Sequence, residues 1–357
     1  MITRRSLLAG AAALALPIPS FAASKPLKVG FLYQAPRDDK GWTSKHEAAR
    51  IKVQEHFGDK VETTYVENVS KAPDAERVIR QMAQSGHDLI FTTSFSFMNP
   101  TVKIAAQFPN VKFEHCTGYK RSANLSTYAA RYYEGRHVLG LISGHMTKTN
   151  TIGYIASFPI PGVLRGINAA YLAAKSVNPD VQMKVVWINT WFDPGKEVDA
   201  ATALIQQGAD VLMQHVNSPA AMKVAQDKGV HAFGLAVDMS EFGPDAHLSS
   251  LMFNWAPYYI KRVQDLLDGK WVSEDTWDGV GPGMVEFAPF SKAIPADVIA
   301  KVDADVKAMS AGTLHPFKGP LKRQDGMVWM TDGQIPSDEE LKKVNFYVEG
   351  IQGSLPT

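Results

Sequence analysis

The sequence predicts an α/β fold built from two domains of similar plan. The chain has 357 residues, of which 45% are hydrophobic and 20% charged, a size and composition that suit two ordinary globular domains. Short apolar runs alternate with helical patterns, which is typical of parallel sheets covered by helices on both faces. This pattern restarts near residue 131. We therefore expect a first lobe at 23–130 plus about 253–320, a second lobe at 131–252, and a surface tail at 321–357.

The first lobe is expected to start with a strand, because the apolar segment 27–33 runs directly into the polar loop 34–41. Similar apolar runs follow at short intervals, and Asn99-Pro100 opens a helix between two of them. The expected strands are 27–33, 61–66, 89–92 and 111–115. The expected helices are 43–57, 73–84 and 100–107.

The second lobe repeats the alternation of strands and helices, starting with a helix rather than a strand. The expected helices are 132–146, 161–177, 194–207 and 219–228, and a further helix at 255–267 follows in the segment assigned to the first lobe. The expected strands are 151–155, 181–188, 211–214 and 231–235, with a further apolar run at 248–252.

The first 22 residues have the features of a secretory signal peptide. Arg4 and Arg5 precede a short apolar run at 7–18, and Ser20-Phe21-Ala22 offers small residues for cleavage. The run is shorter than the roughly 20 residues that cross a bilayer. The two arginines fit the twin-arginine export pattern, and an ordinary Sec signal is the alternative. Because Ala23 replaces the cysteine that a lipid anchor needs, we expect a protein that lies free in a periplasm and is not inserted in a membrane.

Composition and charge argue against several classes of function. The net charge is +1 and no basic stripe or acidic tail appears, so binding to nucleic acid or to a membrane surface has no electrostatic support. Cys116 is the single cysteine, which rules out an internal disulfide, and no cluster has the spacing of a metal site. We therefore expect no cofactor and no metal.

The residues that follow each strand are the candidates for binding a ligand. In open α/β sheets, ligands bind beyond the carboxyl ends of the strands, and two such lobes would line one cleft. These loops mix aromatic rings with neutral hydrogen-bonding groups, which suits a flat ligand with a polar edge. The candidate ligand-binding residues are Tyr33, Trp42, Ser94, Phe95, Trp191, Asp193, Asn217, Asp238 and Trp255.

Several candidates have an ordinary structural alternative. Trp42 and Trp191 could equally pack in the cores of their lobes, and Trp255 could pack between the two domains. Asp238 has the position of a turn or helix cap. His215, at another strand end, is interpreted as a hydrogen-bonded structural histidine.

Motifs for catalysis are absent from the sequence. It has no nucleophile elbow, dinucleotide-binding glycine motif, phosphate loop or zinc-protease motif. The glycine-rich segment 279–283 does not join a strand to a helix, and we interpret it as a turn. We therefore expect a binding protein without catalytic residues.

The sequence resembles the BMP family (basic membrane protein, or purine-nucleoside-receptor type) of ABC-transporter substrate-binding proteins. The resemblance covers about 28–285 and rests on the order and spacing of short segments rather than on any one of them. These segments are 41–43, 133–135, 146–155, 177–180, 191–194, 207–211 and 228–234. The resemblance implies two Rossmann-like lobes, as in type I periplasmic binding proteins, joined by a hinge. It also implies capture of a purine or purine nucleoside in the cleft and delivery to an ABC permease.

Carried over by position, Trp42 looks like the aromatic residue that stacks on one face of the base, where the family usually has Phe. Trp191 occupies the aromatic position of the second lobe, and Asp238 an acidic strand end. The chain departs from the family where Thr117 and Ala236 replace acidic residues and where Gly281 replaces a lysine near the sugar. These groups suit ribose hydroxyls, and a site without them discriminates against a nucleoside. The departures favour a free base, adenine first, over a purine nucleoside.

Three functions stay open at this point. The favoured one is capture of a purine by a monomer that closes about its hinge and delivers the ligand to an inner-membrane ABC permease. A second is a ligand-sensing receptor subunit with the same fold. The third and least favoured is a secreted nucleoside hydrolase, for which only Asp193 and Asp238 lie at suitable strand ends.

Overall fold

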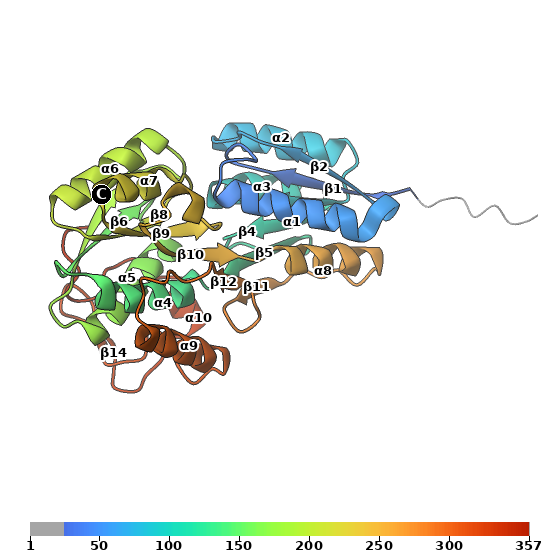
Figure 1. Cartoon of the computed structure of the whole chain (residues 1–357). Helices are drawn as coiled ribbons and strands as arrows, with labels where there is room; N and C mark the ends of the chain where they lie inside the picture. Colours follow the sequence, from blue (N-terminus) through green and yellow to red (C-terminus); the bar gives the residue numbers. More distant parts are fainter. Residues whose placement is uncertain (1–24, 357) are drawn as a thin grey trace, which may run out of the picture.

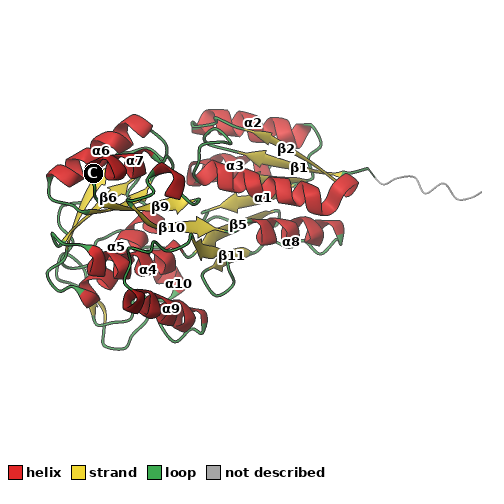
Figure 2. Ribbon diagram, viewed as in Figure 1, coloured by secondary structure: helices red, strands yellow, loops and turns green. Residues whose placement is uncertain are grey.

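The molecule consists of two α/β lobes, each built on a six-stranded sheet (Figures 1 and 2). The computed structural model describes residues 25–356. The first sheet has the order β11-β5-β4-β3-β1-β2 with all pairs parallel. The second has the order β12-β10-β9-β8-β6-β7 and is parallel except for the β10–β12 pair. The predicted fold class is confirmed.

The first lobe contains the N-terminal elements and two that return from later in the chain. Its strands are β1 (Leu27–Leu32), β2 (Val61–Val66), β3 (Leu89–Thr92), β4 (Lys112–Cys116), β5 (Leu125–Ala130) and β11 (Asp275–Asp278). Its helices are α1 (Trp42–Phe57), α2 (Ala72–Gln84), α3 (Met98–Ala105) and α8 (Ala256–Leu267).

The second lobe contains the middle of the chain and most of the C-terminal segment. Its strands are β6 (Thr151–Ala156), β7 (Gln182–Trp187), β8 (Val211–His215), β9 (His231–Ala236), β10 (His247–Phe253) and β12 (Val285–Phe287), with a small hairpin of β13 (Leu321–Lys322) and β14 (Val328–Met330). Its helices are α4 (Tyr132–Met146), α5 (Pro161–Val177), α6 (Pro194–Gln206), α7 (Ala220–Lys228), α9 (Ala296–Ser310) and α10 (Asp338–Leu341).

Burial explains why these segments adopt their structures. Every residue of β3 and of β6 is buried, as expected for central strands with helices on both faces. In α2 the buried residues recur at the spacing of one helical face, whereas most of the other residues are polar. Helices α5 and α6 each begin at a proline, which lacks the amide that would have no partner there.

Three segments connect the lobes. Arg131 links β5 to α4, Asn254 and Trp255 link β10 to α8, and residues 279–284 link β11 to β12. Together they form the expected hinge, because each leaves one sheet and enters an element of the other lobe.

The segment 253–320 divides between the lobes, whereas the sequence assigned it to the first alone. Helix α8 packs on α1 and β11 joins the first sheet, but β12 pairs with β10 and α9 packs on α4 in the second lobe. Residues 1–22, the expected signal peptide, lie outside the described residues. Among residues 25–356, no helix is long and apolar enough to cross a membrane.

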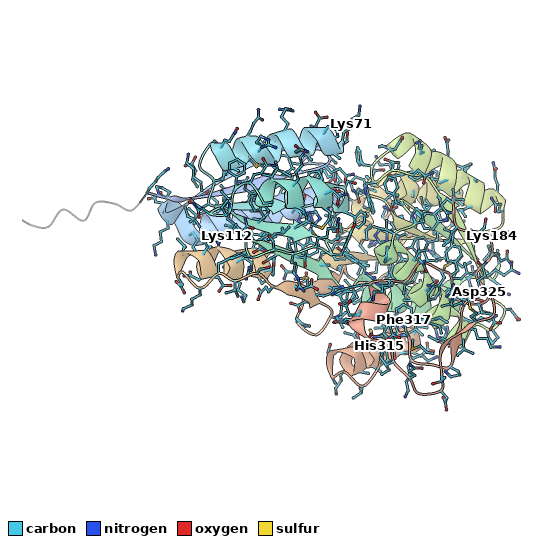
Figure 3. All side chains as sticks on the ribbon, turned by 180° about the vertical axis from the view of Figure 1, so that it is seen from behind. Lys71, Lys112, Lys184, His315, Phe317 and Asp325 are labelled. Atoms are coloured by element: carbon cyan, nitrogen blue, oxygen red, sulfur yellow. The ribbon has the colours of Figure 1, made fainter. Side chains whose placement is uncertain are left out.

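The C-terminal segment is not a simple surface tail. Phe317 and Leu341 are fully buried with Tyr133 of α4, and Tyr347, Val348 and Ile351 belong to the main core. Figure 3 shows Phe317 and His315 on the second lobe, next to its helices. Apolar side chains along the otherwise polar C-terminal segment pack into the second lobe. This packing holds the segment next to the hinge.

Candidate functional site

A cavity of about 370 Å³ lies between the lobes. Most of its lining residues come from the carboxyl ends of strands in both sheets and from the starts of the helices that follow them. The volume falls within the range of about 300–1,000 Å³ that is usual for small-molecule sites. The cavity therefore lies where the topology of two facing α/β sheets predicts a ligand.

Trp42, the first residue of α1, forms part of the aromatic wall. Its indole Nε1 donates a hydrogen bond to the carbonyl oxygen of Thr93, 2.7 Å away. Its ring lies edge-to-face against Trp255 and Phe253, each with a centroid distance of 5.6 Å. Because its polar atom is satisfied and its edges are packed, the ring is held in one orientation at the cavity.

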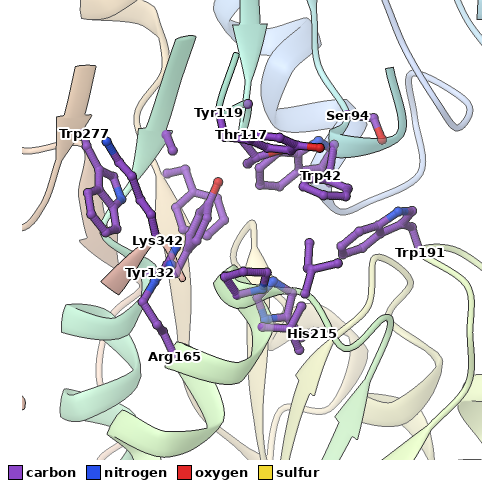
Figure 4. A pocket seen from close by; sticks show the side chains of 18 of the residues that line it. Trp42, Ser94, Thr117, Tyr119, Tyr132, Arg165, Trp191, His215, Trp277 and Lys342 are labelled. Carbon is purple, nitrogen blue, oxygen red and sulfur yellow. The ribbon is translucent and has the colours of Figure 1, made fainter. Parts of the chain in front are cut away.

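Trp191 approaches the same cavity from the second lobe (Figure 4). Its ring packs on Phe158 at a centroid distance of 5.2 Å, and its Nε1 lies 3.4 Å from the hydroxyl oxygen of Ser96 in the first lobe. The amide of Asn217 donates to the carbonyl oxygen of Trp191. Two indoles from opposite lobes therefore line one cavity.

The polar groups near these rings are mostly neutral. The hydroxyl of Ser94 hydrogen-bonds to Gln34, and the side chains of Gln34, Ser94 and Asn217 all line the cavity. Burial, with the nearby charge of Arg136, holds the pKa of His215 well below its usual value. His215 is thus a neutral imidazole, able to donate from one ring nitrogen and accept at the other.

The opposite end of the cavity is more polar (Figure 4). Arg165 donates to the carbonyl oxygen of Leu341 at 2.6 Å and lies over the ring of Trp277. Burial lowers the pKa of Arg165 to about 10. Lys342 forms an ion pair with Asp275 at 2.6 Å. Asp275 is the one carboxylate among the described residues that line the cavity.

Five of the nine residues predicted from the sequence line this cavity, and they come from four different loops. They are Trp42, Ser94, Phe95, Trp191 and Asn217. Each follows a strand or opens the helix after it, which is why strand ends were a sound guide to their position.

The other four predicted residues lie outside the cavity lining. Tyr33 is fully buried and donates from its hydroxyl to Glu47. Trp255 is buried behind Trp42. Asp193 caps the start of α6 by accepting from the amide of Lys196. Asp238 accepts from the amide of Ser240 in a turn, the structural alternative considered for it.

The three positions taken to disfavour a nucleoside have different locations. Thr117 lines the cavity and has a left-handed backbone, with φ of 61°. Ala236 is fully buried at the end of β9 and does not line it. Gly281 lies beside Ser310 of α9, away from the cavity. Only Thr117 therefore bears directly on the shape of the site.

Sequence reasoning missed the polar end of the cavity. Asp275 and Trp277 lie on β11, and Lys342 follows α10; neither element was predicted. Arg165 lies within a helix that was predicted, but no strand end points to it. His215 lines the cavity although it was interpreted as structural. Tyr119 follows β4 and was within reach of the strand-end rule.

The described residues offer no grouping that suggests a metal. Between residues 25 and 356, no set of three or more His, Cys, Asp and Glu side chains is placed to hold an ion. Cys116 is buried, and burial raises the pKa of its thiol far above the usual range. The chemistry that the cavity supports is stacking and hydrogen bonding.

Comparisons with known proteins agree with this architecture. The sequence model of the Bmp family, described as ABC transporter substrate-binding protein PnrA-like, matches residues 27–313. A purine-binding protein of Brucella abortus (strain 2308) is 51% identical over 334 residues, which cover 94% of this chain and 95% of the relative. A putative ABC transporter glucose-binding protein of Haloferax volcanii is 36% identical, covering 93% of this chain and 82% of the relative.

A solved structure has the same fold at low sequence identity. The ABC transporter solute-binding protein of Aeropyrum pernix K1 has a TM-score of 0.71 and 18% identity, covering 89% of this chain and 98% of that one. At this identity the likeness shows the fold alone. The family match, however, spans most of the chain, so the protein belongs to the BMP (PnrA-like) family of ABC-transporter substrate-binding proteins.

Proposed function

We propose that this protein captures a purine in the cavity between its lobes and delivers it to an ABC permease from the periplasm. The observation that carries the proposal is the pair of indoles, Trp42 and Trp191, that reach one cavity from opposite lobes. Aromatic faces suit a flat base, and neutral amide, hydroxyl and imidazole groups suit its edge. The 51% identical relative is named a purine-binding protein, which supports the same ligand class.

We further propose that the ligand is a free base, with adenine first. A ribose brings hydroxyl donors that need acceptors in a buried site. The carboxylate of Asp275 is the obvious acceptor, but Thr127 already donates to one of its oxygens and Lys342 pairs with the other. A nucleoside would have to share this carboxylate with both partners, whereas a base would not.

Delivery to a permease, rather than catalysis, fits the arrangement of charged groups. A hydrolase needs a general base close to the substrate. Asp193 and Asp238 do not line the cavity, and Asp275 is paired. We expect the protein to act as a monomer that closes about its hinge.

A ligand screen tests the proposal. A ligand that binds only the folded protein stabilises it by mass action. We expect thermal unfolding of the purified protein to shift upward with adenine, less with adenosine, and not with amino acids. Calorimetry then gives each affinity. A shift with glucose and none with any purine would overturn the purine assignment and favour the specificity in the name of the 36% identical relative.

A further inference from the structure

The C-terminal segment supplies part of the cavity wall. It lies beyond residue 313, where the family match ends, and it is fastened to α5 of the second lobe. Arg165 donates to the carbonyl oxygen of Leu341. Asn168 donates to the carbonyl oxygen of Phe346 and accepts from the amide of Val348. These contacts fix the backbone on both sides of Lys342.

The C-terminal segment also forms two ion pairs, one with the first lobe and one with the hinge. The Nζ atom of Lys342 lies 2.6 Å from the Oδ2 atom of Asp275 on β11. Arg131, at the hinge, donates to both carboxylate oxygens of Asp338, at 2.8 and 2.7 Å. The cationic groups of Arg131, Arg165 and Lys342 all lie within 5.7 Å of the centre of the Trp277 ring. The segment therefore bridges the lobes around this tryptophan.

This bridge lies at the polar end of the cavity. Lys342, Asp275, Trp277 and Arg165 all line it. Figure 4 shows Lys342, Trp277 and Arg165 opposite Trp42 and Trp191. The side chains of Lys342 and Asp275 are 30% and 22% exposed, so the pair lies where this end meets solvent. An ion pair this exposed contributes little to stability. Its position suggests a role in selecting the ligand.

We propose that Lys342 is a specificity-determining residue whose side chain, held by Asp275, closes the polar end of the cavity and limits the ligand to a free purine base. The proposal rests on the function proposed above. With a base between the two indoles, a sugar would extend toward Lys342. Its hydroxyl hydrogens need an acceptor, and the one carboxylate among the described residues that line the cavity, that of Asp275, is held by Lys342.

Substitution of Lys342 tests this inference. We expect Lys342→Ala to lower the ratio of the adenosine Kd to the adenine Kd about tenfold, because the cavity opens and the Oδ2 atom of Asp275 loses its 2.6 Å partner. Lys342→Arg, which keeps the ion pair, should retain the wild-type ratio. Lys343→Ala is the matched control, since this neighbouring lysine is exposed and does not line the cavity. Titration calorimetry with both ligands gives the ratios.

The outcomes separate this inference from the proposed function. Adenine binding by the wild type with an unchanged ratio in Lys342→Ala would overturn the inference and leave purine capture standing. An equal change in Lys343→Ala would also overturn it, because a general charge effect would then account for the result. Failure of the wild type to bind any purine would overturn the function and the inference together.

Discussion

Gly41 in the first lobe lies directly against the backbone of Asn217 in the second, so closely that a β-carbon on Gly41 would be 1.9 Å from the carbonyl oxygen of Asn217. Gly41 precedes α1, with φ of −154° and ψ of −128°. The close contact between the lobes requires glycine here, because any side chain would overlap the backbone of Asn217. The amide of Asn217 also donates a hydrogen bond to the carbonyl oxygen of Trp191. The contact with Gly41 therefore helps to position the loop that carries one of the two indoles.

Gly41→Ala should prevent the lobes from closing fully. We expect the adenine affinity to fall by about 1–3 kcal/mol, the usual cost of an extra carbon in a packed interface. The unliganded protein should lose much less stability, because the lobes relieve the overlap by opening. Calorimetry and thermal melts measure the two effects. Gly195→Ala is the control, since a β-carbon there makes only ordinary contact with Asp193. Equal affinity in both variants would contradict the assignment.

Trp42→Ala removes one stacking face of the proposed site. Stacking of a base on an aromatic side chain contributes about 1–3 kcal/mol, so we expect adenine to bind more weakly by that amount. Trp42→Phe should recover most of the loss while giving up the hydrogen bond to Thr93. Trp187→Ala, on β7 and outside the cavity lining, should leave the affinity unchanged. An unaltered Kd in Trp42→Ala would remove this residue from the site.

The periodicity of the sequence was enough to predict every α-helix and every strand up to residue 267 except β5. Each expected helix and strand in that range is present with its ends within two residues of the structure. Strand β5 was missed because its sequence, LSTYAA, is short and contains buried Ser126 and Thr127 instead of an apolar run. Burial of these hydroxyls depends on partners far along the chain, such as Asp275 and Arg262, which no local pattern reveals.

The binding site was only partly predictable for a related physical reason. The rule that ligands bind beyond strand ends located Trp42, Ser94, Phe95, Trp191 and Asn217. It could not place Lys342, because the apolar residues that anchor its segment, such as Leu341 and Val344, are separated by polar ones without a clear period. It also selected Asp238 and Trp255, since a strand end can serve a turn or a core as well as a ligand.

Arg262 connects α8 to the first sheet through an ion pair with Glu114 of β4. Its guanidinium and the carboxylate of Glu114 are both fully buried and 2.6 Å apart, and Arg262 also donates to Ser126 and to the carbonyl oxygen of Val272. Arg262→Met would leave Glu114 buried without its counter-charge. We expect it to lower the free energy of unfolding by about 3–5 kcal/mol.

The control for Arg262→Met is the double variant Arg262→Met/Glu114→Gln, in which both charges are removed. That double variant should regain a large part of the loss, because no unpaired ion remains buried. Urea titrations of the three proteins supply the comparison. A double variant that is as unstable as the single one would show that the lost hydrogen bonds, and not the unpaired charge, dominate.

Glu197 joins two of the second-lobe loops that line the cavity. One carboxylate oxygen accepts from the amide of Asp193, and the other accepts from the amide and hydroxyl of Ser218. The side chain is fully buried. Burial, as the largest cause, raises its pKa to about 7 in spite of these hydrogen bonds. The folded protein therefore binds this proton more tightly than the unfolded chain, in which a glutamate titrates near pH 4.3.

The sign of the pH dependence follows from this difference. A carboxyl with a raised pKa stabilises the fold fully below about pH 4.3, and its contribution is lost as the pH rises through about 7. Glu197→Gln, which resembles the protonated acid, should abolish that loss. We expect the fall in unfolding free energy from about pH 5 to about pH 8 to be smaller in the variant by about 1–3 kcal/mol. Glu241→Gln, at an exposed glutamate, controls for removal of one charge. Parallel urea titrations that show the same fall in the wild type and in Glu197→Gln would refute this role for Glu197.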